Sequence, residues 1–187
     1  MPKMKLEKRA QLIRTAVKLA YRHGFRETSL ADIAAAAKIP VGNVYYYFKT
    51  KDEIGVAIVE QRLLEFRALR EQWDRARSPK ERLQACVENT LGNRDVLARG
   101  GCPLGTLCSE LHKEGGPLAE KSTALFGELL AWIEDQFRAD GHGDDSRGHA
   151  VHLLSALQGV SVLAHGSGEP ELVVMETRRL RDWVRAL

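Results

Sequence analysis

The sequence has few cysteines, and their arrangement does not indicate a disulfide framework. Three cysteines, Cys86, Cys102 and Cys108, occur in 187 residues, and no two of them form a C-x-x-C pair. An odd count without a recognisable secretion signal is typical of proteins from a reducing compartment. We therefore expect a cytoplasmic protein.

Long apolar runs, strand patterns and phosphate-binding glycine loops are lacking as well. No segment approaches the roughly 18 consecutive apolar residues of a membrane helix, and the first residues predict an amphipathic helix, not the apolar block of a signal peptide. Alternation of apolar and polar residues, the mark of half-buried strands, is also missing. We predict an all-α protein that has no membrane segment and no cofactor.

Charge is distributed unevenly along the chain. Residues 1–51 hold 11 Lys and Arg against 3 Asp and Glu, whereas residues 52–187 hold 17 against 22. A basic head on an acidic body is typical of a module that binds a polyanion, joined to a body that does not. A solvated basic face is the alternative explanation of the same pattern.

Apolar periodicity predicts about nine helices over the whole chain. Their expected ranges are 5–23, 30–37, 41–48, 51–77, 78–96, 104–112, 118–139, 149–167 and 170–186. We predict two domains, a three-helix head over residues 1–50 and a helical bundle over residues 51–187.

Within the head, the second and third helices have the pattern of a helix-turn-helix. Thr28 and Ser29 supply hydroxyl caps for a short alanine-rich helix. Ile39 is the apolar residue expected in the turn, and Pro40 suits the first position of the next helix. The third helix, 41–48, is then the recognition helix.

The recognition helix carries three of the four tyrosines of the chain, in the segment Val44-Tyr45-Tyr46-Tyr47-Phe48, followed by Lys49 and Lys51. Neighbouring helix positions diverge by about 100°, so some of these hydroxyls face outward. Phenol and ammonium donors beside the small Gly42 suit a nucleic-acid backbone. The alternative is a helix that docks on its own domain through Tyr45 and Phe48.

The head resembles the DNA-binding signature of tetracycline-repressor-type (TetR family) transcriptional regulators. The pattern is Thr28-Ser29-x-x-x-Ile33-Ala34-x-x-Ala37-x-Ile39-x-x-Gly42-x-Val44-Tyr45-x-Tyr47-Phe48-x-x-Lys51-x-Glu53, within a match from about Lys8 to Gln61. Lys38 stands where the family usually has glycine, and Pro40 where it usually has serine. If Lys38 adopts a left-handed backbone, it carries strain on the order of 1 kcal/mol and places a further charge near phosphate.

The resemblance implies a DNA-binding regulator, most naturally a repressor, that binds a palindromic double-stranded operator. Tyr47 and Lys51 are expected at phosphates, Asn43 and Tyr46 at base edges, and Val41 at a thymine methyl group. The residues expected at the DNA are Thr28, Ser29, Lys38, Val41, Gly42, Asn43, Tyr45, Tyr46, Tyr47 and Lys51.

The last two helices carry wide apolar stripes that suit either a homodimer interface or the interior of a single chain. A short recognition helix reads few bases, so pairing of two copies at a spacing of about 34–36 Å favours the dimer. In the family the last two helices usually form it. The residues expected in the interface are Leu153, Leu157, Val160, Ser161, Ala164, Leu180, Trp183 and Val184.

The resemblance also implies a pocket in the body for a small-molecule inducer that shifts the separation of the two recognition helices. The candidate lining residues are Leu64, Phe66, Leu91, Cys102, Leu107, Leu111, Leu125, Leu129, Trp132, Leu157 and His165. Buried core residues have the same apolar character, so this list describes either environment.

Cys102 supports a second interpretation. It precedes a short helix whose dipole favours the thiolate, and the segment beginning Gly101-Cys102-Pro103 resembles one found in electrophile- and oxidant-sensing repressors of the family. A structural thiol is the alternative. A third possibility, from another class, is a helical protein–protein adaptor with a degenerate DNA head.

Metal and enzyme functions have little support in the sequence. Cys108 and His112 share a helix face and, with Cys102, could suggest a metal site, but two ligands at helical spacing are commonly coincidental. A hydrolase using Cys102 and His112 lacks a base-orienting partner and an oxyanion turn. We expect neither a metal ion nor catalytic residues.

Overall fold

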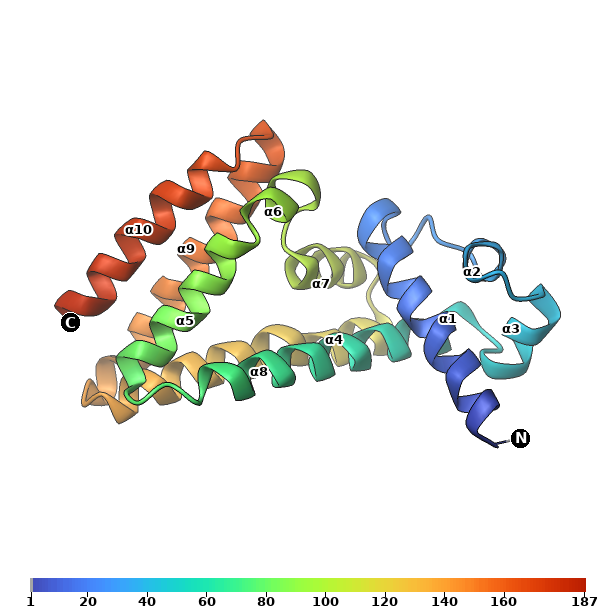
Figure 1. Ribbon diagram of the computed structural model, residues 1–187, viewed down its shortest axis with the longest axis horizontal. Coiled ribbons are helices and arrows are strands. Elements are labelled where there is room, and N and C mark those ends of the chain that lie inside the picture. The colour runs from blue at the N-terminus through green and yellow to red at the C-terminus, as the bar shows by residue number, and fades with distance from the viewer. Residues whose placement is uncertain (1) are drawn as a thin grey trace. The chain divides into compact units, whose positions relative to one another are not determined.

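The computed structural model describes residues 2–187, with side chains from Lys5 onward, and in this part of the chain the regular elements are all helices, joined by short loops (Figure 1). The helices are α1 (Pro2–His23), α2 (Leu30–Ala37), α3 (Val41–Tyr47), α4 (Lys51–Trp73), α5 (Pro79–Gly92), α6 (Arg94–Gly100), α7 (Pro103–Glu114), α8 (Gly116–Ala139), α9 (Ser146–Ser167) and α10 (Glu171–Ala186), with a 3-10 turn η1 (Gly143–Asp145). The predicted all-α class is confirmed. No helix in the described part of the chain is long and apolar enough to cross a membrane.

The helix boundaries differ from the prediction mainly between Trp73 and Gly100. The single helix expected over residues 78–96 is interrupted at Asn93, which ends α5 and begins α6. Its backbone, at φ −101° and ψ 10°, leaves the helical region there. Helix α4 also ends at Trp73, before the predicted Arg77. The break at Asn93 raises the number of α-helices in the described part of the chain from the expected nine or so to ten.

The chain divides into two compact units. The first runs from the amino terminus to Glu65 and includes Thr106–Leu125, and the second comprises Phe66–Gly105 and Phe126–Leu187. Helices α4, α7 and α8 therefore contribute residues to both units. The predicted head, residues 1–50, lies within the first unit, and its boundary at residue 50 stays a prediction.

The second unit is built around a core supplied by α4, α5, α8, α9 and α10. Fully buried side chains include Leu83 of α5, Ile133 of α8 and Leu153 of α9. Trp132 of α8 packs against Trp73 of α4, with ring centroids 5.2 Å apart, and its indole N–H donates to Asp74 at 2.9 Å. The inner faces of α9 and α10 are thus used within this unit.

Candidate nucleic-acid interface

Helix α2 begins with a reciprocal cap. The Ser29 hydroxyl accepts from the Asp32 backbone N–H at 3.1 Å, and the Asp32 carboxylate accepts from the Ser29 backbone N–H at 2.9 Å. The hydrogen bonds from the Ser29 hydroxyl and backbone hold the pKa of Asp32 below its ordinary value. This capping box satisfies N–H groups that the first helical turn leaves without partners, so it fixes where α2 starts.

The turn between α2 and α3 is closed by Lys38 in the left-handed conformation, with φ 54° and ψ 41°. Its backbone N–H and that of Ile39 bond to carbonyls of the last turn of α2, at 3.1 Å and 3.0 Å. The Ile39 side chain is buried. The apolar turn residue is confirmed, and Lys38 has the left-handed backbone that the sequence left as a condition. Pro40 lies one position earlier than predicted, since it caps α3 and Val41 is the first helical residue.

Helix α3 has one buried and one exposed face. Val44 and the following cap residue Phe48 are buried in the head, whereas Tyr46 is 58% exposed and Tyr45 49%. Internal docking therefore uses Val44 and Phe48, and the alternative of docking through Tyr45 is wrong. The exposed face presents phenol, amide and small apolar groups together.

Most of the residues expected at DNA are accessible. Ser29, Lys38, Val41, Gly42, Asn43, Tyr45 and Tyr46 are exposed, and Tyr47 and Lys51 are half-buried. Thr28 differs, because its side chain is buried and its hydroxyl donates to the Gly24 carbonyl at 2.7 Å. Thr28 therefore holds the loop before α2 and offers nothing to the solvent-facing surface.

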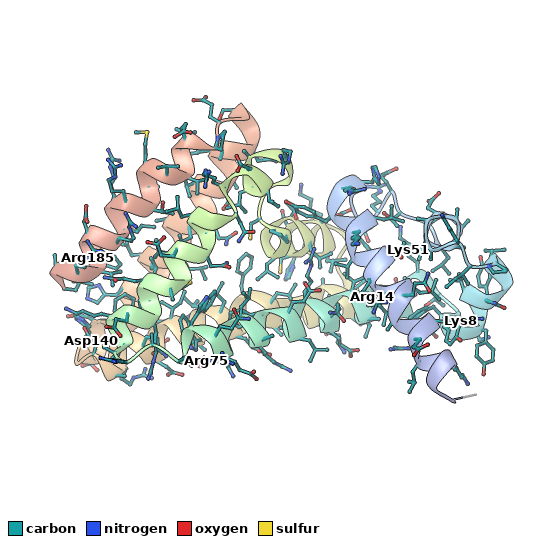
Figure 2. The ribbon with its side chains drawn as sticks, in the orientation of Figure 1. Lys8, Arg14, Lys51, Arg75, Asp140 and Arg185 are labelled. Atoms are coloured by element: carbon teal, nitrogen blue, oxygen red, sulfur yellow. The ribbon has the colours of Figure 1, made fainter. Side chains whose placement is uncertain are left out.

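Lys51, labelled in Figure 2, is the first residue of α4 and contacts the loop before α2. Its ammonium donates to the Arg26 carbonyl and lies 5.0 Å from the centre of the Phe25 ring. The side chain is half-buried as a result. A phosphate contact by Lys51 would have to share or replace these interactions.

Two cations of α1 lie beside aromatic residues of α3 and its C-cap, a juxtaposition that the sequence did not reveal. The Lys5 ammonium lies 4.6 Å from the centre of the Tyr46 ring, and a hydrogen bond with Tyr46 raises the pKa of Lys5. The Arg9 guanidinium lies 5.2 Å from the centre of the Phe48 ring. The basic start of the chain was a visible signal, but its neighbour in space is about forty positions away in sequence.

Helices α2 and α3 cross at a tight turn, and α3 has an exposed polar and aromatic face. Helix-turn-helix proteins bind the major groove with this arrangement. Gln11 of α1 stabilises this arrangement, because its amide donates to the Ala37 carbonyl at the end of α2, at 2.9 Å. The first unit thus contains a helix-turn-helix DNA-binding head.

Residues 12–58 match the model of the family described as bacterial regulatory proteins, tetR family. The chain is 30% identical over 124 residues to the transcriptional regulator AcuR of Cereibacter sphaeroides, an alignment that covers 65% of this chain and 55% of that protein. It is 26% identical over 182 residues to the HTH-type transcriptional repressor ComR of Escherichia coli strain K12, covering 90% and 85%. The chain thus spans about half the length of the first of these relatives.

The fold is shared with a TetR transcriptional regulator of Chloroflexus aurantiacus, with a TM-score of 0.87 at 18% identity over 99% of this chain and 97% of that one. This likeness concerns the fold alone. The matched head and the named relatives make the chain similar to one class of protein, the DNA-binding transcriptional regulators. Residues 12–58 thus have the DNA-binding head of the TetR family.

The residues predicted to line an inducer pocket are divided between the two units. Phe66, Leu129, Trp132 and Leu157 lie together in the core of the second unit. Leu107, Leu111 and Leu125 are buried in the first. Leu91 and Cys102 are half-buried, whereas Leu64 and His165 are exposed. Their role in ligand binding stays a prediction.

The residues predicted for the dimer interface are mostly buried within the chain itself. Leu153, Leu157, Val160, Ser161, Ala164, Leu180 and Val184 are buried, and Trp183 is half-buried. Val160 and Ala164 pack with Leu97 and Val173 in a small core between α6, α9 and α10. These side chains therefore face inward, and the surface of α9 consists of other residues, described below.

The three thiols differ in accessibility. Cys86 and Cys108 are buried and Cys102 is half-buried. Burial raises the pKa of Cys86 to about 12, so this thiol is protonated at neutral pH. Cys102 lies just before α7 and its sulfur accepts from the Gly105 backbone N–H at 3.5 Å. Among the side chains described, no group of three His, Cys, Asp or Glu residues is placed to hold a metal ion.

Proposed function

We propose that the protein is a repressor that binds a palindromic operator as a homodimer and releases it when a small molecule binds the body. The observation that carries this proposal is the exposed face of α3, where Asn43 and Tyr46 are accessible to solvent. The capping box of α2 and the hydrogen-bonded turn at Lys38 hold this helix in the head. The basic charge of residues 1–51 supports attraction to DNA. The printed name of ComR, a repressor, favours repression.

The dimer is proposed to form through the outward face of α9 together with α10. Apolar side chains on this face are strongly exposed, with Val162 at 70%, Leu163 at 63% and Met175 of α10 at 56%. The small residues Ser155, Gly159 and Gly166 share the exposed side of α9. Two such faces can approach closely and bury their apolar side chains, as paired helices do in four-helix interfaces.

The inducer is proposed to act by population shift. In one conformation of the dimer the two recognition helices have the spacing of the operator, and in another they do not. A ligand releases the operator if it binds the second conformation more tightly than the first by several kcal/mol. The proposed site is the region of the second unit that contains Phe66, Leu129 and Trp132. By its class, such a regulator acts in the cytoplasm, where the genomic DNA is.

A binding assay on the DNA that flanks the gene of this protein tests the proposal. The expected result is salt-dependent binding to one palindromic segment, far tighter than to a scrambled duplex of equal length. Equal affinity for both duplexes would contradict operator recognition. Absence of binding to either would favour the protein–protein adaptor.

Cys102 supports a variant of this function in which an electrophile is the inducer. Cys102 is the one partly accessible thiol of the three, and the Gly105 N–H lies against its sulfur. Alkylation by a small maleimide should therefore modify Cys102 before Cys86, and should release the operator if the thiol is a sensor. Mass spectrometry of the three thiols, with binding measured before and after, decides between the two kinds of inducer.

A further inference from the structure

The loop between α1 and α2 carries polar backbone groups that neither helix satisfies. Gly24 turns the chain at φ +87°. Two carbonyls of the loop are bonded to side chains of the head and of α4, since Gly24 accepts from Thr28 and Arg26 accepts from Lys51. The N–H groups of Phe25 and Arg26 point instead toward a side chain distant in sequence.

That side chain is Glu110 of α7. One carboxylate oxygen accepts from the Phe25 N–H at 2.8 Å, and the other accepts from the Arg26 N–H at 2.6 Å. Two successive backbone N–H groups form a small concavity for an anion, and hydrogen bonds to an ionised acceptor are stronger than those between neutral groups. The Glu110 carboxylate therefore holds the loop before α2 through two hydrogen bonds.

The fit around Glu110 is close. A Cβ atom at Gly24 would lie 3.0 Å from one Glu110 oxygen, and the positive φ of Gly24 also favours glycine. Phe25 is buried beside Gly55 of α4, where an added Cβ would lie 2.8 Å from its ring. The loop is thus fixed on both sides, by the carboxylate and by the ring.

We infer that Glu110 is a positioning residue that couples α7 to the DNA-binding head and thereby sets the orientation of α3. The connection runs from the carboxylate through residues 25 and 26 to Thr28 and the capped start of α2, and then through the Lys38 turn to α3. A movement of α7 carries the carboxylate with it, so the loop must follow or lose its partner. This inference rests on the proposed dimeric operator binding.

The other end of α7 belongs to the unit in which ligand binding is proposed. Its residues Pro103–Gly105 belong to the second unit. There an added Cβ at Gly105 would lie 2.7 Å from the Gln158 amide oxygen and 3.6 Å from the Phe126 ring. One continuous helix therefore connects this crowded region with the loop before α2.

The test compares Glu110→Gln with Glu114→Gln. The first keeps the size of the side chain but removes its charge and one of its two acceptor oxygens. The second makes the same change one turn further along α7, at an exposed position, and serves as the matched control. Glu110→Asp keeps the charge but has a shorter side chain. Its operator affinity and spacing preference should therefore lie between those of the wild type and Glu110→Gln.

The first measurement is binding to the operator found next to the gene and to duplexes with one or two base pairs added or removed between the half-sites. The wild type and Glu114→Gln should lose affinity about tenfold or more for each altered spacing, because the two α3 helices are held at one separation. Glu110→Gln should bind the natural spacing more weakly and lose less than about threefold on alteration. A general loss of folding would weaken binding to all duplexes alike and would also speed hydrogen exchange at the buried amides of α1, which the second measurement detects.

The second measurement is amide hydrogen exchange at Phe25 and Arg26. In Glu110→Gln these two amides should exchange roughly tenfold faster, with the buried amides of α1 unchanged. Wild-type spacing preference in Glu110→Gln, or equal effects in Glu114→Gln, would overturn the inference. If the wild type binds no palindromic duplex, the proposed function itself fails, which is a different result.

Discussion

Lys38 has the left-handed backbone that glycine normally supplies, and it is the one non-glycine residue with positive φ among those described. An L-residue pays roughly 1–2 kcal/mol for that conformation, while glycine loses more chain entropy on folding, by about 0.5–1 kcal/mol. Lys38→Gly should therefore raise the free energy of unfolding by about 0.5 kcal/mol. Denaturant titration measures this change.

The same substitution should weaken DNA binding, because the exposed Lys38 ammonium is lost. The slope of log affinity against log salt should flatten by about one charge per subunit. Lys38→Asn is the control, since asparagine also tolerates the left-handed region but carries no charge. If the salt slope is unchanged in both variants, Lys38 does not contact phosphate.

Asn43 is expected to contact a base, whereas Lys38 is expected to contact the phosphate backbone. It is exposed in the first turn of α3, where the amide of asparagine suits the paired donor and acceptor of adenine. Asn43→Ala should cost about 1–3 kcal/mol at one or two operator positions and relax preference there. Affinities for a set of single-base operator variants measure this loss of base preference. A uniform loss across all variants would assign Asn43 to the backbone instead.

At the scale of elements, α4 and α8 are joined in the second unit by a two-pronged ion pair between Arg67 and Glu128. The guanidinium donates to both carboxylate oxygens, at 2.9 Å and 2.5 Å. The hydrogen bonds from Arg67 lower the pKa of Glu128. A carboxyl whose folded pKa is lowered stabilises the protein above its unfolded pKa, and this contribution is lost as the pH falls through the folded value.

Glu128→Gln should accordingly lower the free energy of unfolding at neutral pH and make no difference in acid, below the lowered pKa of Glu128. The effect should be small and should shrink in high salt, because the pair is partly exposed. Denaturation curves at several pH values measure it. Glu71→Gln, a charge change at an exposed position of α4, is the control and should lack the pH dependence.

Periodicity and capping residues predicted most elements because their signals are local. The capping boxes at Ser29 and Ser78 lie within four residues of the helices they start. The break at Asn93 was missed because the apolar spacing continues through it from Leu91 to Leu97. The contacts of Lys5 with Tyr46, and of Glu110 with Phe25, join distant segments, and no local pattern reports such pairs.

At the scale of the whole molecule, the question for α9 is which face meets a second copy. The sequence places apolar residues almost all round this helix, so periodicity could not separate the inner face from the outer one. Packing within the second unit decides the matter for Val160, which is 5% exposed, and for Val162, which is 70% exposed. Two positions apart on a helix, these valines diverge by about 200°.

Charged substitutions at these two valines should therefore have different consequences. Val160→Glu would bury an unpaired charge against Leu97 and Val173, at a cost of several kcal/mol, and should unfold the second unit. Val162→Glu should leave the helical content and the melting temperature of the monomer unchanged, because its side chain faces solvent there. In the proposed dimer it would instead place two charges in an apolar interface.

Sedimentation at micromolar concentration separates these outcomes. The wild type should sediment as a dimer, Val162→Glu as a folded monomer, and Val96→Glu, a change at an exposed valine of α6, as a dimer. Operator affinity should fall with the dimer in Val162→Glu, since one recognition helix alone reads few bases. If Val162→Glu is fully dimeric, the outward face of α9 is not part of the dimer interface. If the wild type is monomeric, the proposal that the protein binds its operator as a dimer is wrong.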